Sequence, residues 1–241
     1  MIWQRKNPFL YGRERAEVES HFPDLHFIEE HGFVFLRGSF PVLYEGRPLD
    51  RYTIEVQLAR NHPAELPIVR EIGGRIPHHS DRHVNADTGI ACVLIPDERW
   101  RLWPVGESLL GYLTGPLHSF FLAQTMVEEG EPWPFGQWAH GPKGVFQFYR
   151  ELLDTTELKV MIAYLACLSA ENPKGHWPCP CQNGKRLRDC HSAEIKNLRR
   201  NISRKDAAAS LAILKTAGVS AIELTEAKPL ANSLCNRLNH R

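Results

Sequence analysis

The sequence has few cysteines for its length and no long apolar run. Six cysteines among 241 residues are too sparse for a disulfide-stabilised secreted scaffold. No apolar run approaches the roughly 18 residues that a membrane-spanning helix requires. Residues 1–6 also lack the apolar stretch of a secretory signal. These absences argue against a membrane protein and a secreted protein, and we expect the chain in the reducing cytoplasm.

Net charge is equally small, but it is unevenly distributed. Lys and Arg total 29 against 28 Asp and Glu. Residues 174–241 carry 13 basic against 5 acidic side chains, whereas residues 1–173 carry 16 against 23. The change falls at Asn172-Pro173-Lys174-Gly175, a composition typical of a domain boundary. The basic end is either a solvated face or a surface for an acidic partner or nucleic acid.

The spacing of apolar residues predicts an α+β fold. Alternation places Tyr52, Ile54, Val56 and Leu58 on one face of a strand. Consecutive strands with short connections indicate an antiparallel meander. The expected strands cover residues 25–30, 33–40 and 51–59, and the expected helices cover residues 13–21, 108–127, 145–153 and 156–170.

Two segments interrupt this regularity. Residues 60–105 contain five prolines and four histidines without a clear period, and long irregular segments of a compact domain are often functional. Gly115-Pro116 is expected to kink or divide the helix over residues 108–127.

The sharpest local pattern is a cluster of cysteines near residue 180. Cys179, Cys181, Cys190 and His191 form C-x-C-x8-C-H. Two thiolates followed by a Cys-His pair can close a tetrahedral metal site. The alternative is a loop with three free cysteines, but half of the cysteines of the chain fall within twelve residues here.

This run resembles the SEC-C motif, a small zinc-binding module that reads C-x-C-x-S-G-x5-C followed by His or Cys. The spacing here is the same, with Asn183 where serine is usual. The resemblance covers about residues 176–192. It implies a structural Zn²⁺ and a docking surface rather than a catalytic site.

Cys92 lies in the irregular segment, in His83-Val-Asn-Ala-Asp-Thr-Gly-Ile-Ala-Cys92. A cysteine on a glycine-containing loop near His, Asn and Asp is a candidate nucleophile. The competing interpretation is a small buried apolar residue, because Val93, Leu94 and Ile95 follow it directly.

The wider pattern resembles the ubiquitin-conjugating enzyme superfamily. That family has a proline-rich Tyr-Pro segment after its third strand, then His-Pro-Asn, then Gly-x-x-Cys, then a tryptophan. Here these positions are His62-Pro63 with Pro67, then His83-Val84-Asn85, then Gly89 to Cys92, then Trp100. The resemblance spans roughly residues 10–150 and implies the family's antiparallel meander flanked by helices.

Two departures and one addition distinguish the chain from the family pattern. Val84 replaces the central proline, Asn85 stands one residue closer to Cys92 than is usual, and residues 133–141 form an additional Trp- and Gly-rich loop. With the SEC-C motif, the combination resembles the bacterial branch of the superfamily, found in ubiquitination-like operons and in antiviral systems of the CBASS type. There, related proteins pass the C-terminus of a ubiquitin-like modifier, or of a nucleotidyltransferase, to an amine.

The resemblance implies a thioester on Cys92. Asn85 matches the family residue that stabilises the oxyanion, although a turn role is an equal alternative. His83 matches a histidine usually read as structural. No glycine-rich nucleotide loop is present, so we expect a separate activating enzyme or an already activated acyl donor. Trp100 is expected to pack beneath the active-site segment.

Other polar residues have weaker alternatives. His78 and His79 are either exposed loop residues or a base for the incoming amine, and with His83 they form a less favoured metal-hydrolase pattern. Asp97 and Glu98 read as a solvated acidic turn or as a contact for the acceptor lysine. His140 is a possible neighbour of Cys92 that nothing in the sequence places there.

We therefore expect a conjugating-like domain over residues 1–155, a connecting helix over residues 156–172, and the zinc module with a basic helical tail over residues 173–241. Lys185, Arg186 and Arg188, with the basic stretch 196–205, would form the docking face. A protein partner is favoured over nucleic acid, because no aromatic residue follows Trp177. The alternative to catalysis is a non-catalytic protein-binding module of the same fold.

Overall fold

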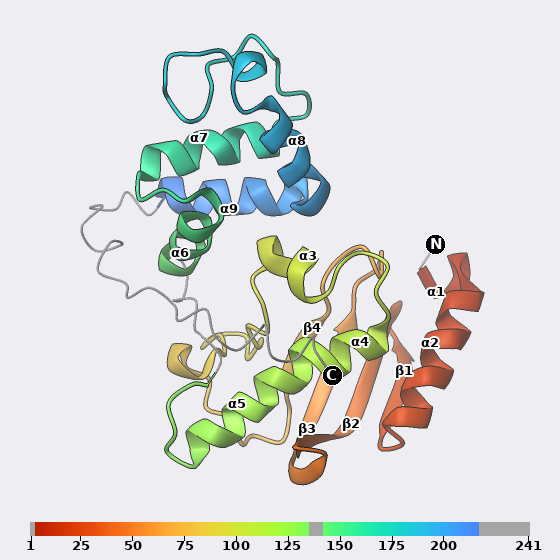
Figure 1. Cartoon of the computed structure of the whole chain (residues 1–241). Helices are drawn as coiled ribbons and strands as arrows, with labels where there is room; N and C mark the ends of the chain where they lie inside the picture. The colour runs from red at the N-terminus through yellow and green to blue at the C-terminus, as the bar shows by residue number, and fades with distance from the viewer. Residues whose placement is uncertain (1–2, 135–141, 217–241) are drawn as a thin grey trace. The chain divides into compact units, whose positions relative to one another are not determined.

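The computed structural model describes residues 3–134 and 142–216, and the chain separates into two compact units (Figure 1). Within the described residues, the first unit holds residues 3–94 and 101–134, and the second holds residues 95–100 and 142–216. The chain therefore enters the second unit briefly, just after Cys92, and returns. No helix among the described residues combines the length and the apolar character needed to cross a bilayer.

The first unit is built on a four-stranded antiparallel sheet in the order β1-β2-β3-β4, so the expected α+β class and antiparallel meander are confirmed. The β1–β2 turn, at His31-Gly32, and the β2–β3 turn, at Glu45-Gly46, have positive φ at both central residues. That geometry matches the right-handed twist of the flanking strands. The strands are β1 (Leu25–Glu30), β2 (Phe33–Tyr44), β3 (Arg47–Leu58) and β4 (Ile68–Glu71).

One face of the sheet is buried, as the alternation in β3 predicts. Tyr52, Ile54, Val56 and Leu58 are all at most 2% exposed. The close approach of β1 to β2 requires glycine at position 38, because a Cβ there would lie 1.8 Å from the carbonyl oxygen of Asp24. The short strand β4 lies in the segment that has no sequence pattern; four residues are too few to show a period.

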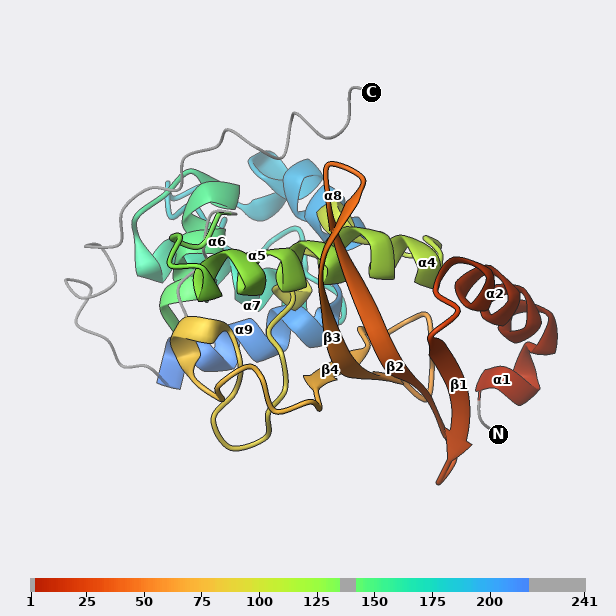
Figure 2. The same cartoon turned by 90° about the horizontal axis from the view of Figure 1, so that it is seen from below.

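Helices cover the buried face of the sheet and its β1 edge. α5 (His118–Glu128) packs across the sheet against β2, as Figure 2 also shows. α5 continues α4 (Leu109–Tyr112) through a π-helical turn over Leu113–Leu117, because Pro116 has no N–H for the regular α-helical hydrogen bond. The expected helix is therefore interrupted but not divided. The N-terminal helices are α1 (Trp3–Lys6) and α2 (Pro8–His21).

The second unit is helical and has its own apolar core. α7 packs along α9, and α6 contacts both. Arg199 of α8 donates to the carbonyl oxygens of Cys167 (3.2 Å), Ala170 (2.6 Å) and Glu171 (3.0 Å), which caps the C-terminus of α7. The helices are α6 (Pro142–Leu153), α7 (Leu158–Ser169), α8 (Ser192–Asn201) and α9 (Arg204–Thr216).

The division between the units differs from the expected boundaries at 155 and 172. Phe146, Phe148 and Tyr149 of α6 are buried in the core of the second unit, so that unit begins before residue 155. α7, the expected connector, supplies buried residues to the same core. Burial of these apolar faces, rather than the charge distribution, decides where the units part.

Trp100 does not have the expected place beneath the Cys92 segment. It packs against the core of the second unit, in the short helix α3 (Arg99–Leu102), where the chain turns back to the first unit. The fully buried indole of the first unit is Trp103 (0% exposed), whose Nε1 donates to the carbonyl oxygen of Ser108 at 2.8 Å.

Asp97 does not lie in the expected solvated turn, because it is buried in the second unit (2% exposed). It belongs to the 3-10 helix Pro96–Glu98. The Tyr149 hydroxyl donates to its Oδ1, and the Ser210 hydroxyl donates to its Oδ2 at 2.7 Å. Burial raises the pKa of this carboxyl group. Asp97 therefore does not offer an exposed carboxylate to an acceptor lysine, because it is buried and accepts from two hydroxyls of the second unit.

Asp97→Asn should make the stability of the second unit less sensitive to pH. The native pKa of Asp97 is raised above its unfolded value of about 3.9. Between those two values the native state binds more protons, so this contribution to stability falls as the pH rises. We expect wild type to lose stability relative to Asp97→Asn as the pH rises from the unfolded value of about 3.9 through the raised native pKa of Asp97, measured by urea unfolding. An Asp97→Leu control leaves both hydroxyls unpaired and should cost about 1–3 kcal/mol for each; a stability difference independent of pH would contradict this account.

Candidate functional site

The cysteine cluster is held by a small hairpin in the second unit. The N–H of Leu187 donates to the carbonyl oxygen of Trp177 at 2.8 Å, and the N–H of Cys179 donates to that of Lys185 at 2.9 Å. Gly184, with a φ of 80°, lies at the tip, which returns the chain to the first cysteines. A 3-10 helix over Leu187–Asp189 then leads into Cys190 and the start of α8.

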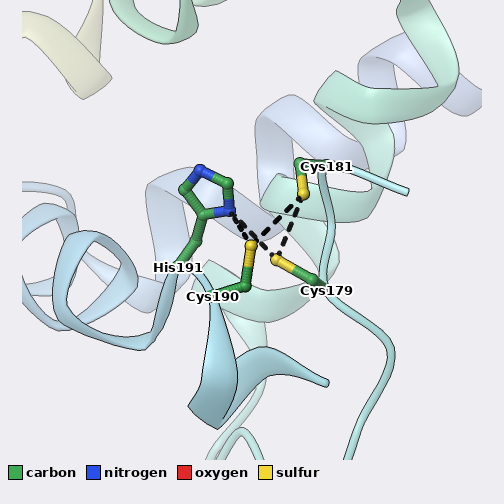
Figure 3. Close-up of side chains that lie close together, drawn as sticks. All are labelled: Cys179, Cys181, Cys190 and His191. Atoms are coloured by element: carbon green, nitrogen blue, oxygen red, sulfur yellow. Dashed lines mark hydrogen bonds between the residues drawn. The ribbon is translucent and has the colours of Figure 1, made fainter. Parts of the chain in front are cut away.

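The hairpin brings Cys179, Cys181, Cys190 and His191 together (Figure 3). Their ligand atoms all lie within 4.8 Å of one another, close enough to hold one metal ion. The Sγ atoms of Cys179 and Cys190 are each 3.1 Å from Nδ1 of His191. The Sγ atom of Cys181 is 3.4 Å from that of Cys179 and 3.7 Å from that of Cys190. This is the ligand set expected from the sequence.

The surroundings of these ligands favour thiolates unequally. Burial raises the pKa of the Cys179 thiol to about 11. Burial also acts to raise the pKa of Cys190, but hydrogen bonds, the strongest from the Asn183 amide at 3.1 Å, outweigh it and lower that pKa. Asn183 also accepts from the N–H of Lys185 at 3.0 Å, so it both forms the turn and supports a ligand. A bound cation would displace the remaining protons.

No family model, curated protein or solved structure matches the chain. Its candidate sites therefore rest on their own geometry.

The Cys92 loop is fixed from two sides in the first unit. Residues 90–92 pair with β4, since the N–H of Ala91 donates to the carbonyl oxygen of Val69 at 2.8 Å. Residues 90–92 also pair with residues 83–85. The N–H of Cys92 donates to the carbonyl oxygen of His83 at 2.7 Å, and the N–H of Asn85 donates to the carbonyl oxygen of Ile90 at 2.9 Å. Cys92 is exposed at the end of this paired segment, so the interpretation as a buried apolar residue is wrong.

Asn85 holds the turn between these arms. Its Oδ1 accepts from the N–H of Asp87 at 3.1 Å, and from the N–H and the hydroxyl of Thr88 at 2.9 and 2.8 Å. These bonds form the side-chain turn that asparagine commonly makes. They fix the plane of the amide and use its oxygen, while Nδ2 takes no part in them.

The three histidines of the loop, His78, His79 and His83, have different surroundings. His83 is buried, has a φ of 51°, and its ring lies 4.2 Å from that of Trp133, in keeping with the structural role expected of it. His78 covers Gly89, where a Cβ would lie 2.7 Å from its ring. His79 accepts from the N–H of Asp81 at 3.3 Å. In the described part of the chain, only the Cys3His group has metal-site geometry, which argues against the metal-hydrolase alternative.

Two polar residues beside the Cys3His cluster, Glu194 and Tyr164, were not predicted from the sequence. The spacing of Glu194, three residues after His191, was the available signal, because such residues share a helix face. Tyr164 gave no signal, since only the tertiary fold brings α7 to this site. His140 and most of the loop over residues 133–141 lie outside the described residues.

Native alkylation should distinguish the exposed Cys92 from buried thiols. Although Cys92 is exposed, the surrounding protein excludes part of the water and raises the pKa of its thiol. We expect iodoacetamide to modify Cys92 at a rate that increases with pH, with a midpoint above the usual value of about 8.5. Peptide mass spectrometry measures this, with buried Cys167 as the protected control. A midpoint at or below about 8.5 would contradict the raised pKa.

Proposed function

We propose that the first unit is a ubiquitin-conjugating-like transferase that carries an acyl group as a thioester on Cys92. The observation that carries this proposal is the pairing of residues 83–85 with 90–92, which fixes an exposed cysteine beside an asparagine. The helix, four-stranded meander and following α5 have the order that the sequence resemblance implies. The acyl group would come from a ubiquitin-like modifier or a nucleotidyltransferase, in a bacterial antiviral system.

Strand geometry supports a joint role for Asn85 and Cys92. Val84 is buried and bridges to Ala91, and Asn85 and Cys92, which flank this bridge on its two chain segments, are both exposed. Diagonal neighbours across an antiparallel pair lie about 7–8 Å apart. The Nδ2 amide of Asn85 could then donate a hydrogen bond to the oxyanion that develops on the acyl group at Cys92.

The reaction has two acyl-transfer steps. The Cys92 thiolate attacks the carbonyl carbon of an already activated acyl donor, and the activating group leaves with its electron pair. A free amine then attacks the thioester carbonyl, the C–S bond breaks, the thiolate leaves, and the amine nitrogen loses a proton. Both tetrahedral intermediates place negative charge on oxygen, which the Asn85 amide would stabilise. A separate activating enzyme supplies the donor.

A second candidate function is a non-catalytic protein-binding module. The raised pKa of Cys92 favours it, since a thiol attacks only after losing its proton. The use of the Asn85 oxygen in the turn also accounts for that residue without chemistry.

In the second unit, we propose that the metal is a structural Zn²⁺. Tetrahedral zinc with bonds of about 2.3 Å to sulfur and 2.0–2.1 Å to nitrogen requires roughly 3.8 Å between sulfurs and about 3.6 Å between sulfur and nitrogen. Four of the six ligand pairs are slightly closer than this, at 3.4–3.7 Å between sulfurs and 3.1 Å between sulfur and nitrogen, and all six lie within 4.8 Å, so a small adjustment admits the ion. Four protein ligands leave no open position for a substrate. The exposed Lys185, Arg186 and Arg188 beside it would then dock a protein partner.

Substitutions at Cys92 test the transferase directly. With a modifier and its activating enzyme, wild type should form an adduct that thiol reductant cleaves. Cys92→Ser should give a reductant-resistant ester or no adduct, because an oxyester is not cleaved by thiols under these conditions. Gel electrophoresis with and without reductant measures this. A labile adduct that survives in Cys92→Ala would reject the assignment, and absence of any adduct would favour the binding module.

Asn85→Asp separates the two roles of Asn85. Aspartate keeps the oxygen acceptors of the turn but removes the amide donor, whereas Asn85→Ala removes both. If the amide stabilises the oxyanion, Asn85→Asp should discharge the thioester to an amine roughly 100–1,000-fold more slowly, with little change in melting temperature. If Asn85 only forms the turn, Asn85→Asp should retain the rate and only Asn85→Ala should lose it.

Loss of the metal should affect the whole second unit. Cys179 and Leu187 lie in the same core as α6, α7 and α9, and zinc-finger peptides gain about 10–16 kcal/mol from zinc at neutral pH. We expect Cys179→Ser with Cys181→Ser to lose one zinc per chain, measured by metal analysis, and to lose hydrogen-exchange protection across α7 and α9. Amides of β2 and β3 should stay protected, because the first unit has a separate core. Unchanged protection in α7 would contradict this.

A further inference from the structure

We propose that Glu194 and Tyr164 form the outer shell of the metal centre. In this proposal Glu194 is a positioning residue for the ligand His191, and Tyr164 is a positioning residue for Glu194. The inference rests on the proposed metal site and adds the residues that orient its only nitrogen ligand.

The two nitrogens of His191 have different surroundings. Nδ1 faces the sulfur atoms of Cys179 and Cys190 at 3.1 Å. Nε2 lies 3.5 Å from Oε2 of Glu194. A metal takes the lone pair of Nδ1, so the ring proton must be on Nε2, where it faces a carboxylate. The carboxylate selects the tautomer with its proton on Nε2 and makes Nδ1 a stronger electron-pair donor to the metal.

Tyr164 fixes the carboxylate in turn. Its hydroxyl donates to the same Oε2 of Glu194 at 3.1 Å. Tyr164 is 4% exposed, in α7, so its hydroxyl is held by a packed ring rather than by a mobile surface side chain. Glu194 is half-buried in the first turn of α8, where the positive end of the helix also favours a negative charge.

The contact between Tyr164 and Glu194 joins the cysteine hairpin, residues 177–191, to α7, which lies earlier in the sequence. Arg199 of α8 also caps the C-terminus of α7, so α8 holds α7 at two points, and the Glu194 contact is the one that leads to the metal. Burial of Cys179 and Leu187 already places the hairpin in the core of the helical unit, and Glu194 and Tyr164 add a polar link from α7 to His191.

Metal affinity of the full chain tests the proposal. Zn²⁺ dissociation constants are measured by competition with a chromogenic chelator for wild type, Glu194→Gln and Tyr164→Phe. Loss of an outer-shell partner typically weakens metal binding 10–100-fold, and we expect a loss in this range for Glu194→Gln and a smaller loss for Tyr164→Phe. The double variant should bind no more weakly than Glu194→Gln, because Tyr164 acts through Glu194.

Asp189→Asn is the matched control. It removes a negative charge adjacent to the ligand Cys190, but Asp189 is exposed and its carboxylate pairs with Arg188 at 3.6 Å. We expect Asp189→Asn to retain wild-type affinity. The absorption spectrum of the Co²⁺-substituted chains gives a second readout, since altered orientation of His191 should change the ligand field in Glu194→Gln and leave it unchanged in Asp189→Asn.

The outcomes separate the two proposals. Wild type that binds Zn²⁺, with Glu194→Gln binding equally well, would overturn the outer shell and leave the metal site standing. Equal losses in Glu194→Gln and Asp189→Asn would also overturn it, because they would reflect charge alone. Wild type that binds no Zn²⁺ or Co²⁺ would overturn both. Tyr164→Phe keeps the buried ring, so its affinity tests the outer shell even where Glu194→Gln is too unstable to measure.

Discussion

Burial of one face of the four-stranded sheet beneath α4 and α5 is the constraint on which the first unit depends. The alternating side chains of β3 fill that interface, and their burial fixes the register of the neighbouring strands. β4 is too short to hold its place alone, but it pairs with β3 and offers its outer edge to Ala91. The position of Cys92 thus follows from the sheet, through one short strand and a few backbone hydrogen bonds.

The described residues of the second unit form no sheet, and the cysteine hairpin and the helices share one apolar core. The cysteine hairpin contributes buried residues to the core that α6, α7 and α9 also form. Residues 95–100 join the same unit, where the buried Asp97 is held by hydroxyls of α6 and α9. The cysteine hairpin is therefore not an appendage, since contacts from His191 to Glu194 and from Glu194 to Tyr164 link its Cys3His cluster to α7.

The two candidate functions of the first unit depend on the same few atoms. An exposed thiol on a fixed loop is what an acyl carrier needs, whereas the raised pKa of that thiol reduces its reactivity in the resting protein. Exclusion of water by the surrounding protein is the cause of this raised pKa, so an acyl donor docking beside Cys92 would act on it by changing the solvation of the thiol. Asn85 has a similar balance, because its oxygen stabilises the loop and its nitrogen is left for another partner.

Features that depend on local spacing could be predicted from the amino-acid order alone. The alternation in β3 predicted its buried face, the C-x-C-x8-C-H pattern predicted the Cys3His cluster, and Gly115-Pro116 predicted the interruption before α5. These succeed because strand period, hairpin ligand spacing and the missing proline N–H act within a few residues. Tertiary structure alone decided that Asp97 is buried, that Trp100 packs in the second unit and Trp103 in the first, and that Tyr164 reaches Glu194. Each depends on which apolar faces meet, and side chains far apart in the sequence meet only when the whole core is closed.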